Sequence, residues 1–152
     1  MSIKSFFAIP FAKQAIKQVY KWANNPHKTQ DKVFKDLISK AKNTAFGKDH
    51  DFKNISSYND FKNRVKVQDY EGLKPYVDRI VEGEEDVLWK GKPIYFAKTS
   101  GTTSGTKYIP ITKESMPTHI KAARNALLFY IAKKNDASFV NGKMIFFKEV
   151  QF

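Results

Sequence analysis

The fold of this chain is organised around one stretch, which reads Thr99-Ser100-Gly101-Thr102-Thr103-Ser104-Gly105-Thr106-Lys107. Most of its residues carry hydroxyls, two are glycines and the last is a lysine. Residues 94–97, just before it, form an apolar, aromatic-rich run that predicts a buried strand. Residues 108–111, just after it, predict a second short strand. The pattern therefore indicates a strand, a hydroxyl-rich loop and a second strand.

A loop of this composition is suited to binding phosphate. Glycine allows a positive φ and lets the main chain approach a ligand closely, while successive N–H groups form a concave anion site to which hydroxyls and a lysine add donors. The stretch is not a Walker loop, because only three residues separate Gly101 from Gly105 and a strand follows. A plain polar hairpin loop is the alternative, although four β-branched threonines are an unusual choice for a loop tip.

Composition and charge leave a second class of function open. The chain has 152 residues, 41% of them hydrophobic, and no cysteine, which fits one globular domain in a reducing cytoplasm. Its net charge of +12 comes from 27 lysines and arginines against 15 acidic residues, as in a small module that binds nucleic acid or an anionic membrane. Lysines spread along the whole chain and only three arginines argue against base readout. No apolar run is long enough to span a membrane.

Local signals predict the helices and their ends. Apolar periodicity indicates an amphipathic helix over residues 11–23, read either as a core helix or as a basic membrane-surface helix. A second helix is predicted to begin at Pro26 and to end at a left-handed Gly47, and a capping box from Ser57 to Asp60 predicts the start of a short helix. Two more helices are predicted, one from about Pro75 to Gly83 and one over 114–134 that is capped by Thr112. A last strand is predicted over residues 143–147. No histidine or acidic set has metal-ligand spacing, and no nucleophile with a base stands out, so we expect neither a metal site nor catalytic residues in this chain.

Three segments together resemble one known family. TSGTTSG at 99–105 resembles the phosphate-binding signature of the adenylate-forming superfamily, in the variant of the auxin-responsive Gretchen Hagen family of acyl-acid-amido synthetases. Residues 69–76, Asp-Tyr-Glu-Gly-Leu-Lys-Pro-Tyr, resemble that family's D-Y-E-x-[LI]-K-P-Y segment, and residues 45–47, Ala-Phe-Gly, resemble its [TS]-x-F-G segment. The resemblance covers residues 22–146 and is closest to bacterial members.

The resemblance implies a fold and a reaction. The expected fold is α/β, with an N-terminal helical region over 1–88 and, over 89–152, the first strands of a layered adenylate-forming domain. ATP, with Mg²⁺, would activate a carboxylic acid as its adenylate, and an amino acid would then attack to form an amide, with neither nucleic acid nor a membrane span involved. The residues expected to bind the phosphates of ATP are Thr99, Ser100, Gly101, Thr102, Thr103, Ser104, Gly105 and Lys107.

The end of the chain departs from the family pattern. Residues 142–146 resemble a strand that in relatives leads to a Q-G-S-P turn, whereas this chain continues as Phe-Lys-Glu-Val-Gln-Phe over 147–152. One choice of codons for those six residues, read two bases later, encodes Gln-Gly-Ser-Pro. We therefore expect a frameshift, which would make the chain an N-terminal fragment of an acyl-adenylating ligase that is inactive alone.

Overall fold

The computed structural model describes residues 3–99 and 105–143. This part of the chain holds six α-helices and one two-stranded antiparallel hairpin, so the described residues are mostly helical and do not show a layered α/β domain. The chain divides into two compact units, one made of residues Met1–Asn25 with Ile120–Phe152 and the other of residues Pro26–His119. Each unit is described by itself below.

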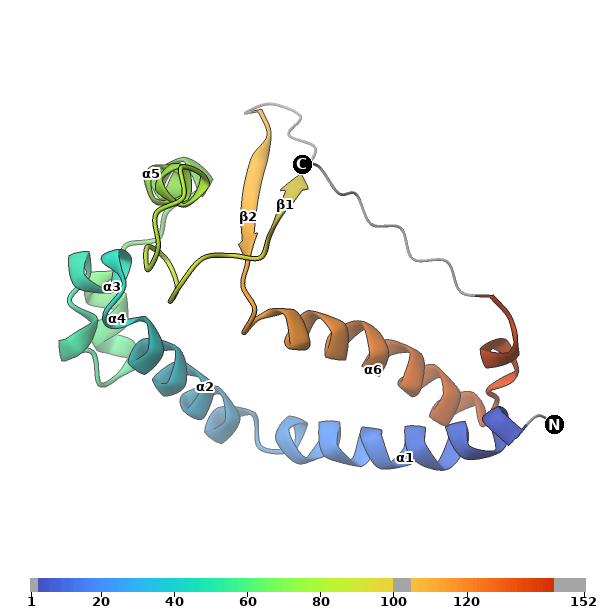
Figure 1. Cartoon of the computed structure of the whole chain (residues 1–152). Helices are drawn as coiled ribbons and strands as arrows, with labels where there is room; N and C mark the ends of the chain where they lie inside the picture. Colours follow the sequence, from blue (N-terminus) through green and yellow to red (C-terminus); the bar gives the residue numbers. More distant parts are fainter. Residues whose placement is uncertain (1–2, 100–104, 144–152) are drawn as a thin grey trace. The chain divides into compact units, whose positions relative to one another are not determined.

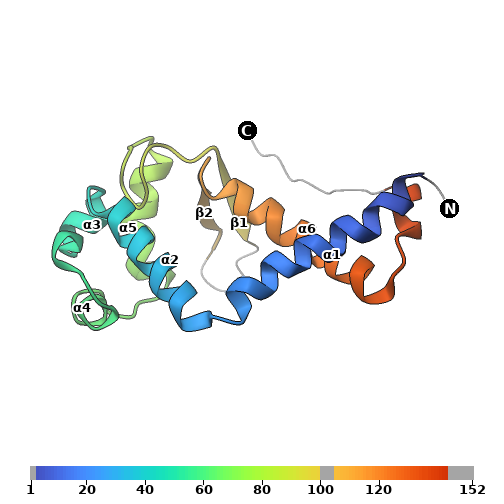
Figure 2. The same cartoon turned by 90° about the horizontal axis from the view of Figure 1, so that it is seen from below.

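The first unit is built on α1 (Ile3–Ala23), the C-terminal part of α6 (Met116–Lys134) and the 3-10 turn η2 (Ser138–Asn141). Figures 1 and 2 show the end of α6 and η2 beside the N-terminal half of α1. Ala12 of α1 is buried with Leu128, Ile131 and Ala137. Residues on one side of α1 therefore meet residues from the other end of the chain.

The start of α1 was predicted wrongly. The sequence predicted a helix over residues 11–23, yet α1 begins at Ile3 and runs through Pro10. Proline inside a helix removes one backbone hydrogen bond and costs about 3 kcal/mol. Ala8 and Ile9, on the N-terminal side of Pro10, pack against the same cluster as Ala12, and this burial offsets the lost bond.

The second unit opens with helices around a small apolar core. These elements are α2 (Pro26–Ala41), α3 (Ala45–Asp49), the 3-10 turn η1 (Phe52–Asn54), α4 (Tyr58–Arg64) and α5 (Tyr70–Val81). Figure 2 shows α3 and α4 close to the C-terminal end of α2. The core consists of Ile38, Ala41, Phe52 and Ile55, with Phe34, Phe46 and Phe61 among the half-buried residues packed on it. We call these seven residues the aromatic cluster.

Gly47 is not the left-handed helix cap that the sequence predicted. It does not end α2, which stops at Ala41, and it lies inside α3 rather than in a left-handed cap. The buried Thr44 caps α3, because its Oγ1 accepts a 3.0 Å bond from the Gly47 N–H and donates a 2.7 Å bond to the Ala41 carbonyl. A Cβ on Gly47 would come within 2.1 Å of that carbonyl oxygen. Glycine is therefore required by the close approach of two helices.

Two other helix ends follow the sequence signals. Ser57 and Asp60 form the predicted capping box of α4. Gly83, at φ +98°, follows α5, and the bonds from Gly83 N to Ile80 O and from Glu84 N to Arg79 O make a Schellman motif. The start of α5 differs from the prediction, since Asp69 caps the helix and places Pro75 in its interior.

The predicted strand, loop and strand form a hairpin. β1 (Tyr95–Thr99) pairs antiparallel with β2 (Lys107–Ile111), and the register runs from Tyr95 opposite Ile111 to Thr99 opposite Lys107. The expectation that the first strand is buried is wrong, because every residue of β1 is exposed. Within the part of the chain that the structure describes, the sheet has only these two strands, so there is no further strand to cover the apolar side chains.

Candidate functional site

The candidate site is the loop end of the hairpin, where the predicted phosphate loop connects the two strands. Thr99, the last residue of β1, lies opposite Lys107, the first of β2. Gly105 adopts φ +78°, and a Cβ there would have no atom within 4 Å. The other predicted phosphate-binding residues, Ser100, Gly101, Thr102, Thr103 and Ser104, lie outside the described residues. The structure thus places the two ends of the loop.

Lys107 is held by an aromatic ring from α5. Its Nζ lies over the ring of Tyr70, 5.5 Å from the centroid, in a cation–π contact. Within the described residues Lys107 makes no ion pair with a carboxylate. Its charge is therefore available to a negatively charged ligand at this end of the hairpin.

The hydroxyl of Tyr70 also holds the main chain of β2. Tyr70 Oη accepts a 2.9 Å hydrogen bond from the Tyr108 N–H and lies 3.5 Å from the Tyr108 carbonyl oxygen. The two residues are 38 positions apart in the sequence. Sequence reasoning missed this role, because it singled out the 69–76 segment only by resemblance and no spacing rule links it to the hairpin.

The helix that carries Tyr70 is fixed at its N-terminus and near its middle. Asp69 caps its N-terminus by accepting a 3.1 Å bond from the Gly72 N–H. Further along, Tyr76 Oη donates a 2.9 Å bond to Asp49 Oδ2, and its ring meets the Phe46 ring edge to face at 5.1 Å. Desolvation, followed by the bond to Asp49, raises the pKa of Tyr76. Through α5, the 69–76 segment thus contacts Phe46 of the 45–47 segment and the first residues of β2.

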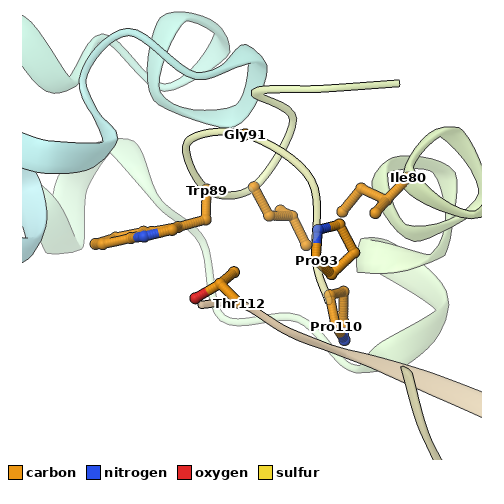
Figure 3. Close-up of a pocket in the computed structure, with 7 residues that line it drawn as sticks. Ile80, Trp89, Gly91, Pro93, Pro110 and Thr112 are labelled. Carbon is orange, nitrogen blue, oxygen red and sulfur yellow. The ribbon is translucent and has the colours of Figure 1, made fainter. Parts of the chain in front are cut away.

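A small hollow lies at the other end of the hairpin. It has a volume of about 110 Å³ and is lined by Ile80, Leu88, Trp89, Gly91, Pro93, Pro110 and Thr112. Figure 3 shows Trp89 and Thr112 on one side of it and Ile80, Pro93 and Pro110 on the other. No charged side chain lines it, so the hollow offers no partner to an anion and is not a phosphate site.

Beside that hollow, lysine charge is matched by carboxylates. Trp89 Nε1 donates a 3.1 Å bond to Glu114, which also pairs with Lys40 at 2.6 Å. Hydrogen bonds to Asp36 and then to Glu114 raise the pKa of Lys40 to about 12. The bond from Lys40, and then that from Trp89, lowers the pKa of Glu114. These charges satisfy one another, in contrast to Lys107.

The described residues offer neither a cluster of metal-binding side chains nor a membrane-spanning helix. Residues 3–99 and 105–143 contain no group of three or more His, Cys, Asp or Glu side chains that could hold a metal ion. None of the helices they form has the length and apolar character needed to cross a bilayer. Ala12 of α1 is buried with Leu128 and Ile131 of α6 and with Ala137. This burial is expected of a helix that packs on a core, the first of the two interpretations of residues 11–23.

Comparison with known protein families assigns the chain to one of them. Residues 15–151 match the GH3 family N-terminal domain. The chain belongs to this family, the Gretchen Hagen family that its sequence resembles.

Plant enzymes are among the similar proteins. Indole-3-acetic acid-amido synthetase GH3.2 of Arabidopsis thaliana is 31% identical over 105 residues, which cover 68% of this chain and 19% of that protein. GH3.5 of the same plant is 26% identical over 141 residues, or 89% of this chain and 22% of the relative. Jasmonoyl--L-amino acid synthetase JAR4 of Nicotiana attenuata is 32% identical over 89 residues, which cover 57% of this chain and 15% of that protein. The chain thus spans about a fifth of the length of these relatives.

Proposed function

We propose that this chain supplies the phosphate-binding part of an ATP-dependent acyl-acid-amido synthetase. The observation that carries the proposal is Lys107, which stands at the mouth of a glycine-flanked hairpin without a carboxylate partner among the described residues and is oriented by Tyr70. Residues 1–88 then form an N-terminal helical region, and residues 89–152 begin a layered α/β nucleotide-binding domain. Membership of the GH3 family supports this assignment.

The reaction has two steps in this proposal. A carboxylate oxygen of the acid attacks the α-phosphorus of ATP, and the bond to pyrophosphate breaks. The nitrogen of an amino acid then attacks the acyl carbon, the bond to AMP breaks, and the amine loses a proton. The conjugating enzymes among the relatives suggest that the acid is a small aromatic or alkyl carboxylic acid.

The loop contributes binding and charge stabilisation to the first step. Catalysis of phosphoryl and nucleotidyl transfer depends mainly on positioning and on neutralising developing charge. The hydroxyls and N–H groups of Thr99 to Gly105 would hold the β- and γ-phosphates, with the glycines allowing close approach of the main chain. Lys107 would add positive charge where pyrophosphate leaves.

Mg²⁺ fits the reaction but not the residues at hand. The part of the chain with described coordinates has no cluster of metal-binding side chains. We therefore assign no step to the metal here.

Binding of inorganic tripolyphosphate tests the proposal, because binding does not require a whole active site. Isothermal titration at fixed ionic strength would compare the wild-type chain, Lys107→Ala and Lys113→Ala. Both variants lose one charge, but Lys113 is exposed beyond the end of the hairpin that lies away from the loop. We expect Lys107→Ala to weaken binding about tenfold, since a charge-assisted bond contributes about 1.5 kcal/mol, and Lys113→Ala to change it less than about twofold.

Equal losses in the two variants would show that diffuse positive charge binds the anion, and would overturn the assignment of the loop. Titration with duplex DNA and with vesicles containing anionic lipid completes the experiment. Binding to either that is stronger than to tripolyphosphate, and that falls steeply with salt, would favour the basic-module alternative.

A further inference from the structure

We infer that Tyr70 is a positioning residue for the phosphate loop, acting through its hydroxyl on β2 and through its ring on Lys107. The inference rests on the proposed function and deepens it. Tyr70 would not touch the nucleotide; it would fix where β2 begins and where the Lys107 ammonium points.

The position of the hydroxyl on the strand carries the first part of the argument. Successive residues of a strand direct their main-chain polar groups to opposite edges. The Tyr108 N–H goes to Tyr70 Oη at 2.9 Å rather than to β1, so it lies on the outer edge of β2. Tyr70 therefore attaches α5 to the hairpin one residue after Lys107.

The ring carries the second part. The Lys107 ammonium lies 5.5 Å from the centre of the Tyr70 ring, and the electron-rich face of the ring attracts it. A free lysine side chain samples many rotamers and loses that freedom when it binds an anion. A lysine that already rests on a ring loses less, so its affinity for phosphate is higher.

The support of Tyr70 carries the third part. Tyr70 is the first residue of α5, directly after the Asp69 cap. Six residues further along, the ring of Tyr76 packs edge to face on Phe46 and holds the same helix, in a contact that does not need the Tyr76 hydroxyl. A binding group is positioned most accurately when it is carried by a rigid element with such support.

Three variants separate the contributions. Tyr70→Phe removes the hydroxyl and keeps the ring, and Tyr70→Leu removes both. Tyr76→Phe is the matched control, because it removes a hydroxyl from the same helix that bonds to Asp49 instead of the hairpin. The readouts are tripolyphosphate affinity by titration and the hydrogen-exchange rate of the Tyr108 amide by NMR.

We expect Tyr70→Phe to speed exchange of the Tyr108 amide and to weaken tripolyphosphate binding, each by about tenfold, the size of one lost hydrogen bond. Tyr70→Leu should weaken binding further, and Tyr76→Phe should change neither quantity by more than about twofold. A merely structural role for Tyr70 would lower stability in the two Tyr70 variants without this selective change in anion affinity.

Two binding results overturn the inference, and together they distinguish failure of the inference from failure of the proposed function. If the wild-type chain binds no tripolyphosphate, the proposed function fails and the inference with it. If the wild-type chain binds and Tyr70→Phe binds equally well, the inference alone fails. The wild-type chain also gives a test that needs no variant: the Tyr70 ring current should shift the Lys107 ε-protons upfield, and ordinary lysine shifts would overturn the placement.

Discussion

The aromatic cluster and the hairpin belong to the same compact unit, and both contain aromatic side chains, which are buried in the cluster and exposed in the hairpin. In the cluster, Phe52 is 6% exposed and meets the rings of Phe46 and Phe61 at 5.8 and 6.1 Å. In the hairpin, Phe96 is 38% exposed and meets only the ring of Tyr108 among the ring contacts of the described residues. The cluster is ordered by burial, whereas the hairpin depends on strand pairing and on its attachment to α5.

The sharpest way to test this difference is to truncate one phenylalanine in each region. Phe52→Ala should lower the free energy of unfolding by about 4 kcal/mol, because it leaves a cavity in the core. Phe96→Ala should lower it by less than about 1 kcal/mol, because its ring is already in contact with water. Urea unfolding followed by tryptophan fluorescence would measure both changes.

Phe52→Leu serves as the control for volume and should lose less than about 1.5 kcal/mol. Comparable losses in Phe52→Ala and Phe96→Ala would mean that the hairpin buries its apolar face against some other part of the protein, and the contrast between the regions would disappear.

The contact of α3 with the end of α2 gives a second test. Gly47→Ala places a Cβ within 2.1 Å of a main-chain oxygen that cannot rotate away. We expect a loss of about 3 kcal/mol in the free energy of unfolding, the upper range for overpacking. Lys48→Ala, on the exposed side of the same helix, should stay within about 0.5 kcal/mol of the wild-type chain.

Thermal unfolding of the two α3 variants side by side provides the measurement. If Gly47→Ala were as stable as Lys48→Ala, the two helices could not approach as closely as described, and Thr44 would lose its place between them.

The capping box of α4 predicts a smaller, pH-dependent effect at the border of the cluster. Hydrogen bonds from the Ser56 side chain first, and also from the Ser56 and Ser57 main chain, lower the pKa of Asp60 from 3.8 to about 2. A carboxylate with a lowered pKa in the folded state stabilises the fold above pH 3.8 and loses that contribution as the pH falls toward 2.

An NMR titration of the Asp60 carboxyl carbon would check this, with a midpoint expected near pH 2. The stability difference between the wild-type chain and Asp60→Asn should be full at pH 6 and shrink below pH 3.8. A midpoint near pH 4 would show that the capping box does not form in solution.

Local signals were enough to predict much of this fold. The capping box at Ser57, the end of a helix at Gly83 and the paired strands on either side of the loop all depend on residues close together in sequence. Their physics is the satisfaction of nearby main-chain groups, which can be predicted from the sequence without knowledge of the rest of the molecule.

Features that depend on distant packing could not be predicted. Gly47 resembled a helix end, but its role depends on the Ala41 carbonyl. The predicted helix began only after Pro10, and contacts with the other end of the chain explain why α1 extends through that residue. Burial of the first strand was inferred from its apolar residues, yet burial also requires a covering layer, which the described residues do not contain.

The candidate site divides along the same line. The composition of residues 99–107 predicted where an anion would bind, and the structure describes the positions of Thr99, Gly105 and Lys107 at the two ends of that loop. The hydrogen bond of Tyr70 to the main chain of β2 could not be predicted. Tyr70 lies 38 residues before Tyr108, and no periodicity or spacing rule applies at that separation.

The outer edge of β2 has a consequence for how the sheet can grow. Tyr108 and Pro110 lie on this edge, two residues apart; the N–H of the first already bonds to Tyr70, and the second has no N–H to offer. An incoming strand would find no available donor at either position. Pairing of a further strand is therefore disfavoured along this edge of β2 and is easier along the outer edge of β1.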